Sequence, residues 1–367
     1  MGVEYLLYFY GAVCLSMIVF NVAYSILLRR SDVHLDQRIQ GFQAAIQRQL
    51  RRLERGEKVE EAYLRRLQRK LRHVNNLIPF ERALRTLSQD GEDVCAQEYM
   101  AQLQPCLLYL AIVYQKKENT QAAYFSYFLS RYMKKVHLPI QTMQEILLDY
   151  IAKENLYCRV NALQALYAFG SVEHILTALH IQDAGSVRLH EKILTEGLLS
   201  FTGEHKSLIE KLWDQFDSFS PHTQLAILNY IRFQSGEYGS EMFALMLDEG
   251  ADKELRISAI RYFGRYPHPT ALEPLLAFTE NNDPTQWEFA TVAASSLAHY
   301  PQSRVMEALK RALHSGNWYV RYAASASLEA LDVRYEDMID IVAGNDRYAR
   351  EMMTYRLESR RIQKASV

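Results

Sequence analysis

The sequence predicts an all-α protein: an α-solenoid of helical hairpins preceded by a single N-terminal transmembrane helix. Three observations lead to this fold class. An uncharged run of 24 residues opens the chain, a basic segment with helical spacing follows it, and a short residue pattern then recurs with a nearly constant step. Regular internal repetition is typical of solenoids, in which each unit buries its apolar face against its neighbours.

The first expected element is a transmembrane helix within residues 1–30. The run from Tyr5 to Leu28 contains no charged residue, and about 20 apolar residues suffice to cross a bilayer. Tyrosines near both ends of the run suit the headgroup level. A cleaved signal peptide is the competing interpretation, but the run lacks a convincing small-residue cleavage pattern. Asn21 either pairs helices within lipid or reaches interfacial water, and the sequence leaves both open.

The charge distribution predicts how this helix is oriented. Membrane proteins retain Lys and Arg on the cytoplasmic side. From Arg29 to Arg72 the chain carries thirteen Lys and Arg against six Asp and Glu, whereas no Lys or Arg precedes the run. We therefore expect a single-pass protein of the cell membrane, with its N-terminus outside and everything after the helix in the cytoplasm. The four cysteines show no disulfide or metal spacing, which agrees with a reducing compartment.

Residues 31–78 are expected to form a basic juxtamembrane helical segment. Leucines recur there at helical spacing and cations surround them. Clusters of Lys and Arg beside a membrane attract anionic lipid, so lipid contact is one interpretation. A solvated helix face with ion pairs such as Glu61–Arg65 is the other, and the sequence leaves both open. The candidate lipid-contact residues are Arg65, Arg66, Arg69, Lys70 and Arg72.

Residues 79–154 are expected to form a helical cap or degenerate repeats. Several segments there are apolar enough to form helices that pack on one another, but they lack the recurring pattern. The central apolar run from Cys106 to Tyr114 is too short to cross a bilayer. This part of the chain is therefore assigned to the solenoid and not to the membrane.

The recurring pattern occupies residues 155–345, and residues 346–367 follow it as a closing helix and tail. The pattern places an Arg, a small residue three positions on and a large apolar residue four positions further on one helical face. A second amphipathic helix follows in each unit, so each repeat is a hairpin. The last position of the pattern reads Leu166, Leu198, Ile231, Phe263, Leu297 and Leu328, with steps of 32, 33, 32, 34 and 31 residues.

These hairpins resemble short HEAT-like repeats of the phycobilin-lyase type. The resemblance rests on a "VR" dipeptide that opens the first helix, as in Val320–Arg321, and covers roughly Asn155 to Gly344. It implies an α-solenoid used as a binding surface, and among membrane-anchored bacterial proteins of this kind it implies a link with glycosyltransferases and polysaccharide export. The repeated Arg residues are interpreted as structural contacts across repeat junctions, with a ligand-binding ladder as the alternative. They are Arg159, Arg256 and Arg321.

No catalytic, metal-binding or cofactor motif is present in the sequence. It has no Gly-rich phosphate loop, no Cys-x-x-Cys and no His-Glu-x-x-His. His190–Glu191 is a single His-Glu dipeptide, whereas the resemblance to iron-dependent HEAT-type hydroxylases would imply several. A nucleic-acid-binding array would carry a basic stripe, but the repeats are net acidic. We therefore expect no enzyme, no cofactor, no nucleic acid and no small-molecule substrate.

The expected function is that of a non-catalytic, membrane-tethered scaffold or regulatory subunit that presents a protein-binding surface in the cytoplasm. The expected partner is an integral membrane protein of a cell-envelope polysaccharide or glycosyltransferase complex. A repeat enzyme of the lyase or hydroxylase type and a sensor of anionic lipid surfaces are the alternatives. Aromatic and Arg residues dominate interface hot spots. The candidate partner-binding residues are Trp287, Trp318, Tyr319, Arg321 and Tyr322.

Overall fold

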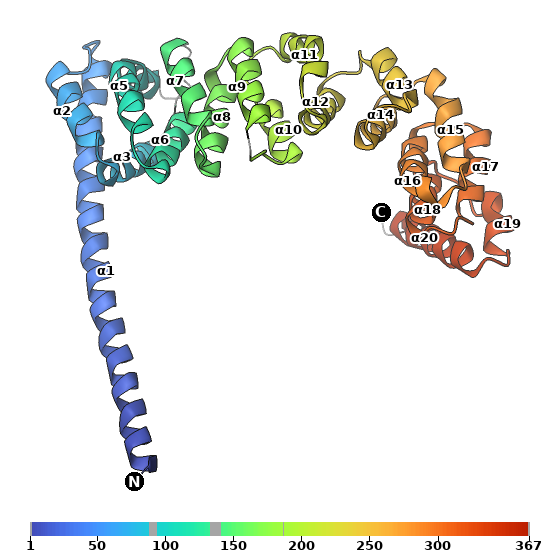
Figure 1. The fold of residues 1–367 in the computed structure, drawn as a ribbon, viewed down its shortest axis with the longest axis horizontal. Helices are drawn as coiled ribbons and strands as arrows, with labels where there is room; N and C mark the ends of the chain where they lie inside the picture. The colour runs from blue at the N-terminus through green and yellow to red at the C-terminus, as the bar shows by residue number, and fades with distance from the viewer. Residues whose placement is uncertain (1, 88–93, 133–140, 186, 366–367) are drawn as a thin grey trace. The chain divides into compact units, whose positions relative to one another are not determined.

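A computed structural model describes residues 2–87, 94–132, 141–185 and 187–365 (Figure 1). Within these residues every regular element is a helix. The chain divides into two compact units, Met1–Val187 and Arg188–Val367. The predicted all-helical class is therefore correct for the described part of the chain, and each unit is described by itself.

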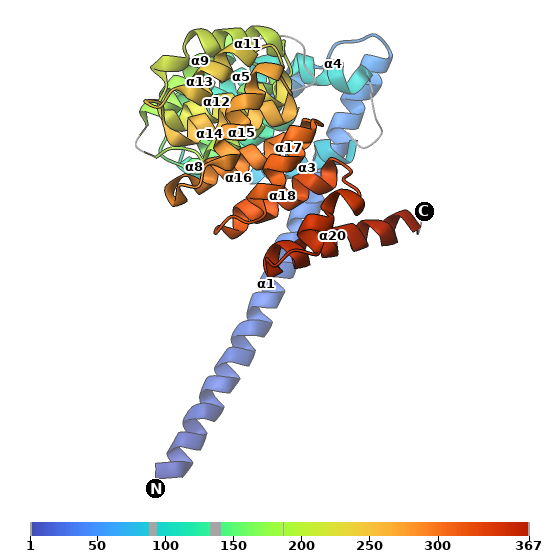
Figure 2. The ribbon, with the colours of Figure 1, turned by 90° about the vertical axis from the view of Figure 1, so that its right-hand side faces the viewer.

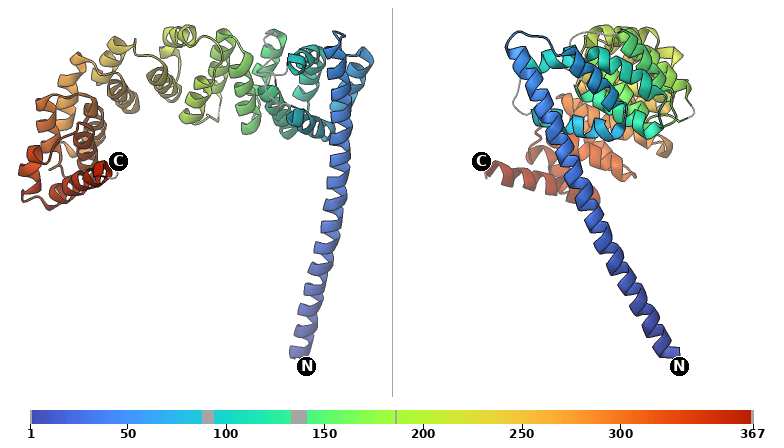
Figure 3. Two further views of the ribbon diagram at one scale, coloured as in Figure 1. Left: turned by 180° about the vertical axis from the view of Figure 1, so that it is seen from behind. Right: turned by 90° about the vertical axis from the view of Figure 1, so that its left-hand side faces the viewer.

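The first unit begins with one long helix, α1 (Gly2–Glu54). Its second half packs against α3 (Val74–Leu87) and α4 (Val94–Gln102). Phe42 and Phe80 lie at the centre of this contact, with ring centroids 5.5 Å apart. The first half of α1 extends away from the other helices of its unit (Figure 3).

The predicted transmembrane helix is contradicted. No helix built from the residues whose side chains are described is both long enough and apolar enough to cross a bilayer. The uncharged run lies in the first half of α1. The prediction of an anchor within residues 1–30, and of a single-pass protein with its N-terminus outside, is therefore wrong. The side chains of residues 3–7, 23 and 25–31 lie outside the described residues.

The other helices of the first unit form two rows. In one row α3 contacts α6 and α6 contacts α8; in the other, α2, α5, α7 and α9 contact one another in turn. Buried tyrosines link neighbours in the second row: the Tyr114 hydroxyl donates to the Leu71 carbonyl at 2.8 Å, and the Tyr150 hydroxyl to the Ala111 carbonyl at 2.7 Å. The helices are α2 (Glu61–Leu71), α5 (Gln104–Gln115), α6 (Asn119–Tyr132), α7 (Gln141–Ile151), α8 (Leu156–Phe169) and α9 (Val172–Ala184).

The second unit continues as hairpins whose first and second helices form separate rows (Figures 1 and 2). Successive first helices contact one another, and each second helix packs on the first helix of the next hairpin. The first helices are α10 (Glu191–Leu199), α12 (Pro221–Gln234), α14 (Lys253–Arg265), α16 (Trp287–Ser296), α18 (Trp318–Ala330) and α20 (Arg347–Ala365). The second helices are α11 (His205–Asp214), α13 (Gly239–Leu247), α15 (Leu272–Glu280), α17 (Ser303–Ala312) and α19 (Ile339–Val342).

Short 3₁₀ turns lead into or end several of these helices. They are η3 (Phe216–Ser218), η4 (Pro269–Ala271), η5 (Pro284–Gln286), η6 (Leu297–His299) and η7 (Glu336–Met338). Asp283 starts η5 by accepting a hydrogen bond from the Thr285 N–H at 2.8 Å. Asn317 caps α18 in the same way through the Tyr319 N–H, also at 2.8 Å. These caps set where η5 and α18 begin.

The core follows the recurring sequence pattern. All six residues of its last position, from Leu166 to Leu328, are 0 % exposed. Hydroxyl groups join neighbouring first helices above this column: Ser327 donates to the Ala294 carbonyl at 2.7 Å, and Ser296 to the Ile260 carbonyl at 3.1 Å. Small residues at these contacts let the helix backbones approach closely. The repeated units thus bury equivalent positions, as the sequence predicts.

The last second helix departs from the pattern. Met338 and Ile339 are adjacent apolar residues at the start of that helix, but Ile339 is 53 % exposed. Here α19 is a single short turn preceded by η7, and Met338 alone of the pair is fully buried. Closing helix α20 ends at Ala365, so residues 366–367 of the predicted tail lie outside the described residues.

Candidate protein-binding surface

The amino-terminal turn of α18 carries three exposed aromatic residues. The helix buries Val320, Ala324 and Leu328 on one face. Positions 318, 319 and 322 point away from that face, because residues three and four apart share one side of a helix. Trp318, Tyr319 and Tyr322 are accordingly 57 %, 55 % and 50 % exposed.

These rings stack on one another and on the preceding hairpin. Trp318 and Tyr322 have centroids 5.1 Å apart and an interplanar angle of 23°. Tyr319 lies against Trp287 of α16 at 5.3 Å and 27°, and meets Trp318 edge-on at 5.3 Å. Four of the five predicted partner-binding residues therefore lie together. We refer to Trp287, Trp318, Tyr319 and Tyr322 as the aromatic surface.

Arg356 of α20 extends the aromatic surface to the last helix. Its guanidinium lies 4.9 Å above the Tyr322 ring. The Nε atom donates to the Ser325 hydroxyl at 2.9 Å, and a terminal nitrogen pairs with Glu329. Arg356 could not be selected from the sequence, because it lies in a different helix from Tyr322. Its contacts fix the orientation of the Tyr322 ring.

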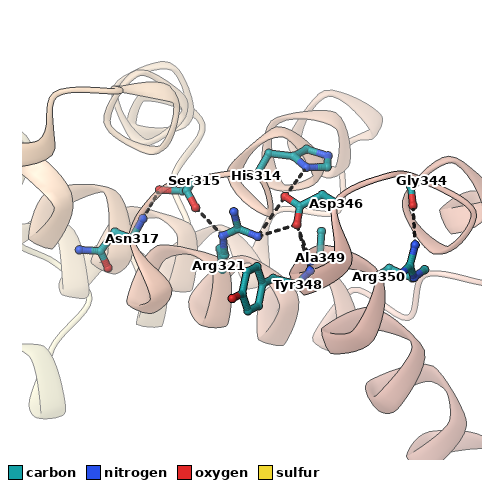
Figure 4. Close-up of polar contacts among 9 residues, drawn as sticks. All are labelled: His314, Ser315, Asn317, Arg321, Gly344, Asp346, Tyr348, Ala349 and Arg350. Carbon is teal, nitrogen blue, oxygen red and sulfur yellow. Dashed lines mark hydrogen bonds and ion pairs between the residues drawn. The ribbon is translucent and has the colours of Figure 1, made fainter.

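Arg321, the fifth predicted residue, points into the junction between hairpins (Figure 4). One terminal nitrogen donates to both carboxylate oxygens of Asp346 at 3.0 Å, and Nε donates to the Ser315 carbonyl. The guanidinium also lies 5.5 Å above the Tyr348 ring. The Arg321 side chain is only 15 % exposed. Its geometry therefore favours a structural contact between repeats over contact with a partner.

Asp346 is the acceptor at the centre of this junction. It accepts hydrogen bonds from Arg321, from the backbone N–H groups of Tyr348 and Ala349, and lies 3.0 Å from Nδ1 of His314. The donors, led by Arg321, hold the pKa of the carboxyl well below its usual range. The carboxylate therefore stays ionised and caps α20 while it binds the preceding hairpin.

The other two repeated Arg residues also make contacts inside the array. Arg256 donates from Nε to the Met246 carbonyl at 3.3 Å and lies 4.9 Å above the Phe289 ring of the next hairpin. Arg159 is buried and donates to the Val187 carbonyl at 2.5 Å. Burial lowers the pKa of its guanidinium. These carbonyl contacts support the structural interpretation for both residues.

Arg350 repeats this arrangement in α20 and was missed by sequence reasoning. It donates to the Gly344 carbonyl at 3.0 Å, six positions before it, as Arg321 does to Ser315 (Figure 4). The sequence signal exists: Arg350, Met353 and Leu357 follow the recurring spacing, with Met in place of the small residue. Asp346 carries a weaker signal, because a helix-capping Asp is common.

The candidate lipid-contact residues separate into two groups on α2. Arg66 and Lys70 line a groove between α1 and α2. Arg65 and Arg69 are exposed and lie outside that groove, and Arg72 follows the helix as its C-terminal cap. All five residues are exposed, and the lipid-contact interpretation stays a prediction.

The described residues contain no group of three or more His, Cys, Asp or Glu side chains arranged to hold a metal ion.

The aromatic surface offers apolar area, ring edges and hydroxyl groups, which suit contact with another protein.

Comparison with known proteins gives one family match. Residues 240–329 match the HEAT repeats family, which takes in α14 to α17 and most of α13 and α18. No curated protein matches the chain. The match supports the conclusion that this chain is a HEAT-like repeat protein, and repeats of this kind generally mediate interactions between proteins.

Proposed function

We propose that the protein is a non-catalytic scaffold or regulatory subunit that binds a partner protein through the aromatic surface. The HEAT-like repeats support the general role in protein interaction. The half-exposed rings on α18, stacked on one another and on Trp287 of α16, support the specific surface. A place in a cell-envelope polysaccharide or glycosyltransferase complex rests on the resemblance alone, and only identification of the partner decides it.

The observation that carries this proposal is that the exposed rings are held in place before any partner binds. Trp318 stacks on Tyr322, Tyr322 lies under Arg356, and Tyr319 stacks on Trp287. Immobilising a side chain on binding costs about 0.5–1.5 kcal/mol, and rings that are already ordered avoid much of that cost. Tyr and Trp also dominate binding energy in protein interfaces. The surface therefore has the composition and rigidity of a hot spot.

Site-specific photo-cross-linking in intact cells tests this proposal. A benzophenone amino acid replaces Tyr322 in the full-length chain, and cross-linked species are identified by mass spectrometry. We expect one protein to be captured specifically, and Trp318→Ala in the same chain to reduce its capture at least fivefold, because loss of an interface Trp costs about 2 kcal/mol or more.

Tyr157 provides the matched control position. It is 72 % exposed and lies on α8 in the first unit, distant in sequence from the aromatic surface. Capture of the same proteins from positions 157 and 322, with no effect of Trp318→Ala, would contradict the proposal.

A further inference from the structure

The first unit contains a groove between α1 and α2. The two helices are joined by the turn at residues 55–60, and the groove between them has a volume of about 760 Å³. Apolar side chains line it along with a row of cations. The apolar residues are Phe42, Ala45, Tyr63 and Leu67, and the cations are Arg38, Arg48, Arg52, Arg66 and Lys70. Glu60 is the one acidic residue in this lining.

Two of these cations are already neutralised near the turn. Arg52 pairs with Glu57 at 2.9 Å, and Arg66 pairs with Glu60 at 3.5 Å. The remaining three, Arg38, Arg48 and Lys70, have no carboxylate within 4.0 Å among the described residues.

These three cations make contacts with backbone carbonyls and with a ring, but not with an acidic group among the described residues. Arg38 donates to the Asn75 carbonyl at 3.2 Å, Arg48 to the Ala44 carbonyl at 3.3 Å, and the Lys70 ammonium lies 5.9 Å above the Phe42 ring. The groove therefore carries positive charge that the described residues do not compensate.

The spacing of these cations indicates an extended ligand. Arg38 and Arg48 are ten residues apart on α1, which is about 15 Å along a helix. A ligand with several acidic groups along its length can contact both. From Arg38 to Arg52 the α1 wall covers about 21 Å, or roughly four helical turns. A polymer with several acidic groups matches this length.

The floor of the groove favours a peptide over a nucleic acid. Single-stranded nucleic acids bind by stacking their bases on exposed aromatic rings. Phe42 and Tyr63 are each only 8 % exposed, so neither ring offers a face to a base. An apolar floor with a charged rim is instead typical of grooves that bind an amphipathic helix.

We propose that the α1–α2 groove binds an acidic amphipathic helix of a partner protein. Its acidic side chains contact Arg38, Arg48 and Lys70, and its apolar side chains cover Ala45, the apolar residue of the lining that is not buried. This second surface lies in the first unit and does not depend on the aromatic surface.

A designed peptide measures this binding directly. The probe is a fluorescein-labelled amphipathic helix of about 18 residues with Glu on one face and Leu on the other. Fluorescence anisotropy with the full-length chain at low salt is expected to give saturable binding in the micromolar range. Arg48→Glu combined with Lys70→Glu is expected to weaken binding at least tenfold. A peptide with Ser in place of Leu is expected to bind at least fivefold more weakly.

Arg65→Glu combined with Arg69→Glu is the matched control, since both residues are exposed on α2 and lie outside the groove. It changes the net charge equally and should change the affinity less than threefold. Circular dichroism confirms that both variants are folded. An equal loss in both variants, or no saturable binding of the acidic peptide, would overturn the proposal. The proposal would also be overturned if oligothymidine or phosphatidylserine vesicles bound more tightly than the acidic peptide and only the Arg48/Lys70 variant lost that binding.

Discussion

At the scale of single residues, the Arg position of the recurring pattern stabilises the stacking of neighbouring hairpins. Arg256 and Arg321 each donate from Nε to a carbonyl before their own helix and lie above an aromatic ring of the next hairpin, Phe289 and Tyr348. A planar guanidinium can do both at once, because its edge donates hydrogen bonds while its face stacks. Lys at the same position would keep the charge but lose this combination.

Asp346→Asn is expected to make stability less dependent on pH. The folded carboxyl has a pKa below the ordinary 3.8, so the folded state binds the proton more weakly than the unfolded chain does. The stabilisation is therefore fully present above about pH 4 and is lost as the pH falls through the folded pKa. At pH 7 the variant should be less stable by about 1 kcal/mol, the upper range for a partly exposed pair.

Thermal unfolding from pH 7 to pH 2.5 checks this expectation. The difference in melting temperature between the natural chain and Asp346→Asn should narrow below pH 4. A difference that stays constant with pH would show that the carboxylate charge does not stabilise this junction.

At the scale of helices, the two rows are joined in different ways. First helices touch through small residues and buried hydroxyl groups, such as Ser327 on Ala294. Second helices are joined by surface ion pairs one repeat apart: Arg304–Glu273, Arg311–Glu280 and Lys310–Asp340. Exposed pairs of this kind each contribute about 0–1 kcal/mol. The close packing of the first row therefore matters more for the stability of the array.

Gly264→Leu tests the close contact between α14 and the end of α16. A Cβ atom at Gly264 would lie 2.9 Å from Oγ and 3.2 Å from Cα of Ser296, so a larger side chain must push the helices apart. Overpacking of this kind costs about 1–3 kcal/mol. Urea unfolding should show that loss.

Gly239→Leu is the control for that substitution, because a Cβ atom at Gly239 meets nothing within 4 Å. Gly239→Leu should leave stability within about 0.5 kcal/mol of the natural chain, as surface substitutions usually do. Similar losses at positions 264 and 239 would argue against a specific clash with Ser296.

At the scale of the whole molecule, the second unit is a chain of nearest-neighbour contacts. Each first helix makes its main contacts with the first helices on either side and with the second helices beside it. Stability in such arrays is approximately a sum of terms for each repeat and each junction. We therefore expect a destabilising mutation in one repeat to affect mainly that repeat and the repeats on either side of it.

Phe263→Ala is expected to destabilise the array locally. The ring is fully buried in α14, and truncating a buried Phe costs about 3–5 kcal/mol. Hydrogen exchange followed by mass spectrometry should show faster exchange in α12, α14 and α16, with α3 and α6 of the first unit unchanged. Phe233→Ala, at a residue 42 % exposed, should change exchange little. Uniformly faster exchange over both units would contradict the nearest-neighbour description.

The repeats could be predicted from the sequence because their signal is local and periodic. Leu166 and Leu328 lie far apart in the chain, yet each is recognised from residues within its own helix. The aromatic surface was partly predictable for the same reason, since Trp318, Tyr319 and Tyr322 share one turn of α18. The HEAT repeats match over residues 240–329 agrees with the predicted repeats.

The features that the sequence did not reveal depend on contacts between distant residues. Asp346 and Arg356 gain their roles only when α20 packs on α18. The α1–α2 groove arises because Arg48 and Lys70, on separate helices, face one space. The transmembrane prediction rested on one uncharged run, and no helix among the described residues is long and apolar enough to cross a bilayer.

The opposed faces of α18 have a consequence for how such proteins diverge. Ala324 and Leu328 are enclosed by neighbouring hairpins, whereas Trp318, Tyr319 and Tyr322 face solvent from the same helix. Mutation can therefore exchange the outward trio for other side chains and recruit a new ligand, while the inward pair keeps the architecture intact. Proteins descended from one ancestral array can therefore bind unrelated partners while they keep the same backbone.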